Sequence, residues 1–160
     1  MANLNTWTVT DSNGASHTIE RKTGFGGNKI IIDGAVYKTK SSNWFINLID
    51  YQIQFPGLNC NLVVIGNKAD LSVNGTYLGS GKAYEPVGSI PAWIWVLVAV
   101  SAIGGWFFGG ILCMAIGIGL STVYVQGYLE KKMNKVWIAF GAFVVIAIIF
   151  LLLNLFLLAV

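Results

Sequence analysis

Side chains that could do chemistry are few in this 160-residue sequence, and they form no recognisable catalytic set. His17 is the single histidine, and no cysteine or acid stands at metal-ligand spacing from it, so we expect a partly buried or surface residue. Asp33, Asp50 and Asp70 stand next to turn residues, where aspartate is favoured by its own side-chain hydrogen bonds. The sequence therefore predicts no catalytic, cofactor-binding or metal-binding residue, and we do not expect an enzyme.

Binding of phosphates or nucleic acids is not indicated either. Gly24, Gly26 and Gly27 only loosely resemble a phosphate-binding loop, because no Gly-Lys-Ser/Thr follows them and no helix is expected to open there. Residues 1–85 carry seven Lys or Arg against six Asp or Glu, which gives no basic stripe for nucleic acid. We interpret the glycines as a strand connection.

Charge is missing from two long stretches of the chain. Only 11% of all residues are charged and 55% are apolar, whereas a soluble domain carries about 25% charge. Residues 86–129 and 136–160 hold no Asp, Glu, Lys or Arg, and the short segment between them holds Glu130, Lys131, Lys132 and Lys135. We therefore expect a soluble domain over residues 1–85 and a transmembrane helical domain over 86–160, and we exclude an ordinary soluble or disordered protein.

The soluble domain is predicted to be all-β. Short β-branched and aromatic runs alternate with turn residues, and Asp33-Gly34 and Asn74-Gly75 are two-residue hairpin signals. About eight strands in this length favour an antiparallel β-sandwich or small barrel. Together with the expected transmembrane helices, this predicts an α+β membrane protein. These strands are expected within nine short runs, two of which are separated by a single residue: 7–10, 17–20, 29–32, 36–39, 44–49, 51–55, 60–65, 71–73 and 76–78.

Strand and turn residues also follow one another in a particular order: Ile31-Ile32-Asp33-Gly34, Trp44-Phe45-x-x-Leu48, Tyr51-x-Ile53, Cys60-x-Leu62-x-Val64 and Asp70-Leu71-x-Val73-Asn74-Gly75. This order resembles the β-domain of the Fas apoptosis inhibitory molecule family over about residues 16–84. The resemblance implies an all-β, cytosolic, non-catalytic module that acts through protein contacts, and it offers no catalytic residue to carry over. The membrane half departs from the soluble members of that family.

Three membrane spans are expected after the β-domain. About 20 helical residues cross a hydrocarbon core of about 30 Å, and a single helix over residues 86–129 would be about 65 Å long. We therefore predict spans at about 90–108 and 110–129, turning at Gly109-Gly110, and a third at about 136–159. One long helix through Gly109 is the structural alternative.

Lysine and tryptophan positions predict the orientation of these spans. Lys131, Lys132 and Lys135 place their loop in the cytoplasm by the positive-inside rule, and an odd number of spans puts the β-domain on the same side. We therefore expect a multi-pass protein of the plasma (cell inner) membrane, and the expected interface anchors are Trp93, Trp95, Trp106 and Trp137.

Two further observations bear on this orientation. Residues 1–5 have neither a basic nor an apolar signal region, and Cys60 and Cys113 are poor candidates to pair, which together favour the cytoplasm. Two spans would instead place the β-domain outside, where the sequon Asn74-Gly75-Thr76 could be glycosylated. We favour a hairpin turn for these three residues.

Small residues recur every four positions in the first two spans. This pattern lets helix backbones approach closely, either within one chain or between subunits of a homo-oligomer. Asn154 is the one polar side chain of the third span, and we expect it to seek a partner or to reach the headgroups. The residues of this small-residue stripe are Ser101, Gly105, Gly109, Cys113, Gly117 and Ser121.

Three functions are compatible with this organisation. The first is a protein-interaction, scaffold or sensing module whose β-domain is held at the membrane by a self-associating helical bundle. The second is a homo-oligomeric channel with the β-domains as a cytoplasmic vestibule, although the spans lack the ionisable groups typical of ion-coupled transport. A membrane-bound enzyme is a distant third. The expected partners are membrane lipid, further copies of the chain and a protein at the β-domain, with no cofactor and no nucleic acid.

Overall fold

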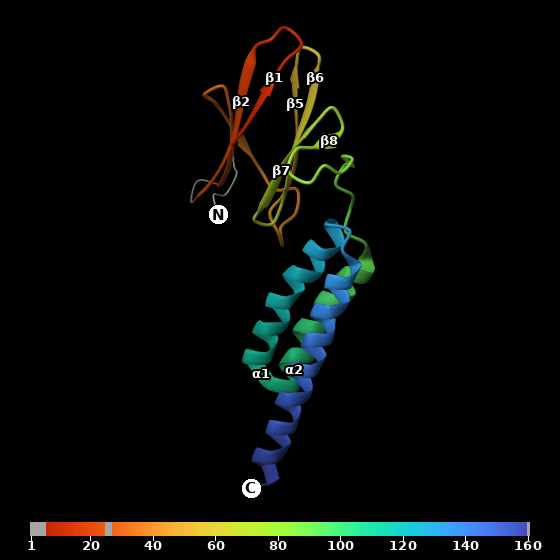
Figure 1. Ribbon diagram of the computed structural model, residues 1–160. Coiled ribbons are helices and arrows are strands. Elements are labelled where there is room, and N and C mark those ends of the chain that lie inside the picture. The colour runs from red at the N-terminus through yellow and green to blue at the C-terminus, as the bar shows by residue number, and fades with distance from the viewer. Residues whose placement is uncertain (1–5, 25–26, 160) are drawn as a thin grey trace. The chain divides into compact units, whose positions relative to one another are not determined.

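The computed structural model describes residues 6–24 and 27–159, and the chain divides into two compact units, residues 1–87 and 88–160 (Figure 1). The sequence placed this boundary after residue 85. The N-terminal segment inspected for a signal sequence and residues 25–26 of the glycine-rich connection lie outside the described residues. Each unit is described by itself below.

The first unit consists of two four-stranded antiparallel sheets, in the orders β1-β2-β3-β4 and β5-β6-β7-β8. Within each sheet, each strand pairs with the next one along the chain, as β-hairpins require. This confirms the expected antiparallel β-structure. The strands are β1 (Thr6–Thr10), β2 (Ser16–Gly24), β3 (Gly27–Ile32), β4 (Ala35–Thr39), β5 (Leu48–Phe55), β6 (Leu58–Ile65), β7 (Lys68–Val73) and β8 (Thr76–Tyr77).

One hydrophobic core joins the two sheets. Side chains on a strand alternate between its faces, and on β6 the alternation buries Cys60 and Leu62 completely. Ile19 of the first sheet and Leu71 of the second are also fully buried. Burying a large aliphatic side chain contributes about 1.5–3 kcal/mol, so this shared core holds the sheets together as a sandwich. Its buried members are Val9, Ile19, Ile30, Ile53, Cys60, Leu62 and Leu71.

Both two-residue hairpin signals form the turns that the sequence predicts. Asp33 and Gly34 have φ values of 50° and 84°, and Asn74 and Gly75 have 47° and 83°. Two consecutive residues with positive φ define the turn whose twist matches a pair of antiparallel strands. The Asn74 side chain links its turn to β6, because its Oδ1 accepts a hydrogen bond from the Asn59 N–H at 3.0 Å.

The strand expected over residues 44–49 is wrong. The backbone is irregular up to Asn47, and Leu48 and Ile49 instead begin β5, which continues unbroken to Phe55. Local side chains explain the difference, because Asn43 Oδ1 accepts hydrogen bonds from the N–H groups of Phe45 and Ile46 at 2.8 and 3.2 Å. An asparagine that binds the backbone two residues ahead stabilises a turn rather than a strand.

The second unit has two helical elements, α1 (Ala92–Leu129) and α2 (Met133–Ala159), where the sequence predicted three separate helices. α1 is nevertheless broken near its middle. Gly109 (φ −150°, ψ 18°) and Gly110 (φ 65°, ψ −152°) leave helical geometry, and glycine alone adopts the second conformation without steric cost. α1 therefore consists of a first arm, residues 92–108, and a second arm, residues 111–129.

The two arms run antiparallel (Figure 1), and residues of both arms contact each other at several points. A Cβ added to Gly105 would lie 2.8 Å from the carbonyl oxygen of Cys113, and one added to Gly117 would collide with that of Ser101. A straight helix would hold Ser101 and Gly117 about 24 Å apart. The alternative of one long rod is therefore wrong, and the glycine pair turns the chain back as expected.

α2 packs mainly against the second arm. The Phe143 ring lies 3.0 Å from the position that a Cβ on Gly117 would take, and the Phe140 and Tyr124 rings are 6.1 Å apart. The short connection before α2 is closed by a hydrogen bond from the Lys132 N–H to the Gly127 carbonyl at 2.8 Å. The helical unit is thus a bundle of three antiparallel segments.

Candidate functional site

The small-residue stripe lies between the two arms of α1. Ser101, Gly105, Cys113, Gly117 and Ser121 are all buried there, and Gly109 forms the break itself. Gly105 and Gly117 permit an approach that any larger residue would prevent, because backbone atoms of the opposite arm occupy the Cβ position. The stripe therefore packs helices within this chain, and association between subunits stays a prediction.

Hydroxyl groups of the arms bind partners within the same unit. The Ser101 and Tyr124 hydroxyls are 3.1 Å apart and link the arms. Ser121 donates to the Gly117 carbonyl and Thr122 to the Gly119 carbonyl, both at 2.7 Å. Such bonds to the preceding helical turn satisfy polar groups in an apolar environment.

Asn154 links α2 to the end of the first arm. Its Nδ2 donates to the carbonyl oxygens of Phe108 and Phe150, both at 2.9 Å. Phe108 is the last residue before the glycine break, and the final carbonyls of a helix lack partners within that helix. The sequence predicted that Asn154 would seek a partner, and the structure supplies one within the chain.

Tryptophans lie towards both ends of the helical unit. The Trp93 and Trp137 rings stack at 6.2 Å beside the 130–135 loop, and Trp93 also meets Tyr128 edge to face at 5.9 Å. Trp95 is half-buried, two residues further along the first arm, and Trp106 is exposed three residues before the break. The role of these four tryptophans as interface anchors stays a prediction.

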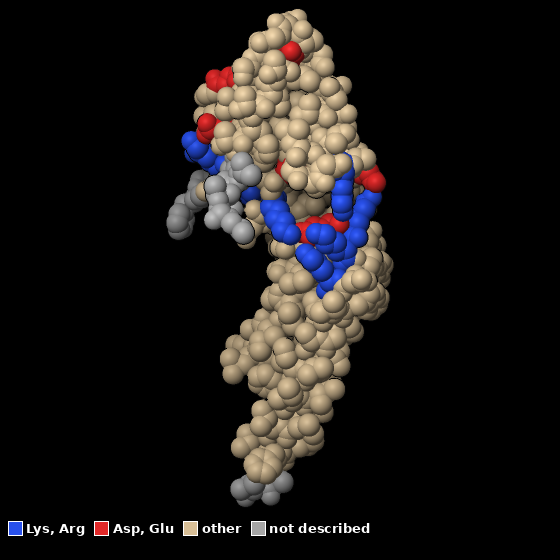
Figure 2. Space-filling view, viewed as in Figure 1, with Lys and Arg blue, Asp and Glu red and all other residues tan. Residues whose placement is uncertain are grey.

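Charge in the helical unit is confined to the 130–135 loop. Lys132 and Lys135 place their Nζ atoms 3.1 and 3.2 Å from one carboxylate oxygen of Glu130. With Lys131, the loop carries three lysines against one glutamate. In Figure 2 the visible face of the helical unit is tan along its length, apart from the end that holds this loop.

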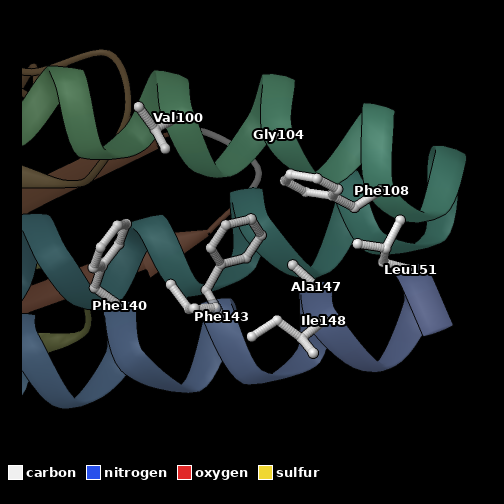
Figure 3. Close-up of a pocket in the computed structure, with 9 residues that line it drawn as sticks. Val100, Gly104, Phe108, Phe140, Phe143, Ala147, Ile148 and Leu151 are labelled. Carbon is white, nitrogen blue, oxygen red and sulfur yellow. The ribbon is translucent and has the colours of Figure 1, made fainter.

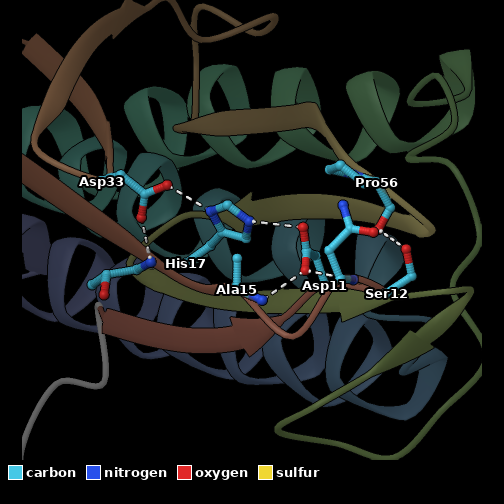
Figure 4. A network of polar contacts seen from close by, with 8 residues as sticks. Asp11, Ser12, Ala15, His17, Asp33 and Pro56 are labelled. Carbon is cyan, nitrogen blue, oxygen red and sulfur yellow. Dashed lines mark hydrogen bonds and ion pairs between the residues drawn. The ribbon is translucent and has the colours of Figure 1, made fainter.

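The β unit holds one polar cluster that the sequence did not reveal, centred on His17 (Figure 4). His17 Nδ1 lies 2.7 Å from Asp33 Oδ2, and Nε2 lies 3.6 Å from Asp11 Oδ2. The imidazole also stacks on the Phe55 ring, with 3.9 Å between centroids and 13° between planes. The cluster thereby joins two turns of the first sheet to a strand of the second.

The turns fix both carboxylates. Asp11 accepts hydrogen bonds from the N–H groups of Asn13 and Ala15 at 2.9 and 2.8 Å, and Asp33 accepts one from Thr18 at 2.7 Å. Asp33 and Asp11 lie far from each other in sequence, so spacing alone could not reveal the cluster. The available signal was an aspartate in each of two hairpin turns.

The cluster favours an imidazolium between two carboxylates. The hydrogen bond to Asp33 raises the pKa of His17 above its usual 6.5; burial opposes this, and Asp11 adds to it. The bond from His17 and the Thr18 N–H lower the pKa of Asp33. Burial disfavours ionisation of Asp11, but the hydrogen bonds from the Ala15 and Asn13 N–H groups, together with the nearby His17 imidazole, outweigh it and lower the pKa of Asp11. This pairing suits a structural clamp.

A second polar cluster fastens the last residues of the β unit to its second sheet. The Tyr84 hydroxyl lies 3.0 and 2.9 Å from the two carboxylate oxygens of Asp50, which also accepts the Val87 N–H at 3.1 Å. Asn61 donates to the same hydroxyl at 3.0 Å. Burial and then the bond to Asp50 raise the pKa of Tyr84 to about 12. Asp50 is therefore a structural anchor.

Metal binding finds no support in the described part of the chain, residues 6–24 and 27–159. Within it, no three His, Cys, Asp or Glu residues gather in a way that could hold a metal ion. Asp70 lies on β7 and Asp50 on β5, not beside turns as the sequence suggested, and the Asp70 carboxylate accepts hydrogen bonds from the backbone N–H groups of Gly79 and Ser80 at 2.9 and 3.1 Å. Its role is to hold the turn after β8.

Fold and side-chain clusters together define a class: an antiparallel β-sandwich joined to an apolar three-segment helical bundle. Comparison with protein-family models, curated proteins and solved structures found no match to this chain. The resemblance of residues 16–84 to the Fas apoptosis inhibitory molecule family accordingly stays a prediction.

Proposed function

We propose that this chain is an integral membrane protein whose helical unit crosses the plasma (cell inner) membrane and anchors a cytoplasmic β-domain that binds another protein. The proposed membrane insertion rests on the exposed apolar surface of the helical unit. α1 and α2 are long and apolar enough to span a membrane, yet only 17% and 22% of their most apolar windows are buried within the chain. Ile138 and Leu157 are each 72% exposed. Surface of this kind needs lipid or another apolar partner.

Three crossings fit the lengths of the helical segments. The first arm measures about 25 Å, the second about 28 Å and the 27-residue α2 about 40 Å. A hydrocarbon core is about 30 Å thick, so each arm can cross it once and α2 can cross it with residues to spare. The glycine break then lies at the far interface, beside Trp106.

Lysine placement supports the orientation. Lys131, Lys132 and Lys135 lie on the connection between the second and third crossings, which the positive-inside rule assigns to the cytoplasm. An odd number of crossings places the β-domain on that side.

Exposed aromatic surface supports a protein-binding role for the β-domain. Trp44 is 84% exposed on the connection between the two sheets, and Val36 and Tyr37 on β4 are 58% and 44% exposed. Tryptophan and tyrosine at such positions are typical of the residues that dominate protein interfaces. The resemblance to the Fas apoptosis inhibitory molecule family points to the same kind of activity.

The channel alternative gains no specific support from the helical unit. Ser101, Ser121 and Thr122 direct their hydroxyls to partners in the same chain, so these groups are not displayed towards a pore. The mass of the purified complex in detergent tests this alternative. A single chain or a small complex supports the anchored module, and a ring of many copies supports the channel.

Cysteine accessibility tests the proposed orientation. Ser80→Cys in the β-domain, Lys131→Cys in the loop and Phe107→Cys beside the break each offer one exposed thiol, because native Cys60 and Cys113 are fully buried. With a membrane-impermeant maleimide, we expect the first two to react only in inside-out vesicles and Phe107→Cys only in right-side-out vesicles. Reaction of Ser80→Cys in right-side-out vesicles would overturn the proposal.

A further inference from the structure

An apolar cavity of about 240 Å³ lies between the first arm of α1 and α2 (Figure 3). Its lining consists of glycine, alanine, valine, isoleucine, leucine and phenylalanine, so the cavity offers neither a charge nor a polar side chain with which to select a ligand. The proposed membrane insertion already accounts for apolar surface on the helical unit. A surface that could recognise a particular partner lies on the β unit instead.

Three lysines lie side by side on the outer face of the first sheet. Lys22 of β2 is the register partner of Lys29 of β3, and Lys29 is in turn the partner of Lys38 of β4. Side chains alternate between the two faces of a strand, so these lysines lie on the face opposite to their buried neighbours Arg21 and Ile30. Two of the three are exposed and the middle one is half-buried. We call these three residues the lysine row.

The lysine row works against the stability of its sheet. Directly opposed side chains on neighbouring strands are about 5 Å apart at Cβ, and like charges at this distance repel each other. In the described part of the chain, Lys22 alone of the three has an ion-pair partner, the Glu20 carboxylate at 3.4 Å. Lysine on an edge strand deters unwanted strand pairing, which accounts for Lys38 but not for Lys22 and Lys29, whose strands are inner strands of the sheet. The row therefore indicates attraction to an external anionic group.

The outer face of the second sheet has the opposite character. There Val63 has Asp50 on β5 and Asp70 on β7 as its register partners, so two carboxylates flank it. Both carboxylates accept hydrogen bonds from the segment 79–87, and Val63 is only 5% exposed although it faces away from the core. The chain thus covers this face itself, whereas Val36 on the outer face of the first sheet is 58% exposed.

The chain also keeps the β unit close to a membrane. The Val87 N–H is bonded to Asp50 of the second sheet, and α1 begins at Ala92. The backbone between Val87 and Ala92 reaches at most about 18 Å when it is fully extended. With α1 entering the membrane as proposed, the cytoplasmic leaflet is the anionic surface nearest to the β unit, and its lipids attract clustered lysines.

We propose that the outer face of the first sheet binds the anionic phospholipid headgroups of the leaflet in which α1 begins, through Lys22, Lys29 and Lys38. The inference rests on the proposed membrane insertion. Val36 lies on the same face and meets the lipid interface in this arrangement, whereas Trp44, on the connection between the sheets, does not belong to this face. The β unit is thereby held on the membrane by one face and does not move freely on its linker.

The test measures how closely each outer face approaches the headgroups. A fluorescent label is attached at Val36→Cys on the first sheet or at Gln52→Cys on the outer face of the second, in a chain whose native cysteines are fully buried. The full chain is inserted into phosphatidylcholine vesicles that carry a nitroxide quencher on the headgroup, with or without phosphatidylglycerol. We expect phosphatidylglycerol to increase quenching at Val36→Cys severalfold, with loss of the increase at high salt. Quenching at Gln52→Cys should not increase.

Two double variants separate the lysine row from net charge. Lys29→Gln with Lys38→Gln removes two members of the row, whereas Lys68→Gln with Lys82→Gln removes the same charge from β7 and from the segment after β8. The first pair should lower the ratio of bound to unbound β unit at least about tenfold, because each lysine beside an anionic bilayer strengthens binding severalfold. The second pair should leave quenching at Val36→Cys near that of the parent chain. Equal losses would overturn the site.

Failure of this inference is distinguishable from failure of membrane insertion. If the labelled chain does not float with the vesicles in a density gradient, the proposed insertion is wrong. If it floats, and quenching at Val36→Cys is the same with and without phosphatidylglycerol, the lipid site alone is overturned and the lysine row is left to an acidic protein. Circular dichroism checks the fold of each variant. Lys22→Gln, which should weaken the quenching severalfold, guards against a double variant that does not fold.

Discussion

The two units of this chain solve the same packing problem in opposite ways. Both are built from antiparallel neighbours, and glycine-containing turns reverse the chain in the hairpins of the sandwich and between the two arms of α1. The β-sandwich buries large aliphatic side chains such as Leu62 and Leu71, whereas the helical bundle brings backbones together through Gly105 and Gly117 and leaves residues such as Ile138 outside. The first pattern suits water, where burial of apolar area is the main driving force. The second suits lipid, where close backbone contact takes its place.

The difference between the two units is tested most strongly by the same change, leucine to alanine, in each of them. Leu62→Ala leaves a cavity in the sandwich core, since Leu62 is fully buried, and should lower the free energy of unfolding by about 2–5 kcal/mol. Leu152 on α2 is 60% exposed, so Leu152→Ala should change the free energy of unfolding by less than about 0.5 kcal/mol. Urea titration in detergent, followed by circular dichroism of the strands and of the helices, measures both. Equal losses would contradict the contrast.

The next largest effect is expected between the two arms. In Gly117→Leu the new side chain meets the Ser101 carbonyl and the Phe143 ring, and overpacking of this kind costs about 1–3 kcal/mol or more. Thermal melting of the helical signal in detergent should show a clear drop, while Gly119→Leu melts like the unaltered chain. If the two leucine variants melted alike, the stripe would have no role in packing.

A smaller effect is expected at the far end of the bundle. Asn154→Leu removes the hydrogen bond to the Phe108 carbonyl, and bonds of this type contribute about 0.6–2 kcal/mol within membranes. The neighbouring Leu155→Ala, at a 55% exposed position, serves as the control. Melting of both variants in the same detergent measures the difference. A melting temperature of Asn154→Leu equal to that of the control would mean that the bond does not stabilise the bundle.

The smallest effect concerns pH and the β unit. Because the folded pKa of His17 is raised, its stabilising contribution is complete below about pH 6.5 and is lost as the pH rises through the folded value. Asp11 and Asp33 have lowered pKa values, so their contribution is present above about pH 3.8 and is lost on acidification. We expect the β unit of the unaltered chain to lose stability from mildly acidic to alkaline pH in urea titrations. His17→Gln should flatten that decline, and an unchanged slope would argue against the clamp.

The sequence predicted the features that neighbouring residues determine better than the features that depend on contacts between distant residues. Asp33-Gly34 and Asn74-Gly75 determine their hairpins through backbone conformation, and Gly109-Gly110 determines the turn in α1 in the same way. The strand expected from Trp44 onwards does not form, because the Asn43 side chain accepts hydrogen bonds from the next backbone N–H groups. The β-propensity of the residues gives no indication of such bonds.

Contacts between distant residues explain the rest of what the sequence could not predict. The recurrence of small residues every four positions predicted close helix packing. It could not show that Gly117 contacts Ser101 of the same chain. His17 finds its two aspartates only after three strands have paired, so its environment is a property of the fold.

A distance between spin labels on the two arms tests the central claim most directly, because the fold of α1 determines the number of crossings. Val96→Cys and Val123→Cys place labels at exposed positions of the first and second arms, in a chain whose own cysteines are buried. Packed helices lie about 8–10 Å apart and each is about 10 Å across, so the account predicts a label separation below about 25 Å in lipid vesicles. A separation near 40 Å, the length of a straight helix between these residues, would contradict it.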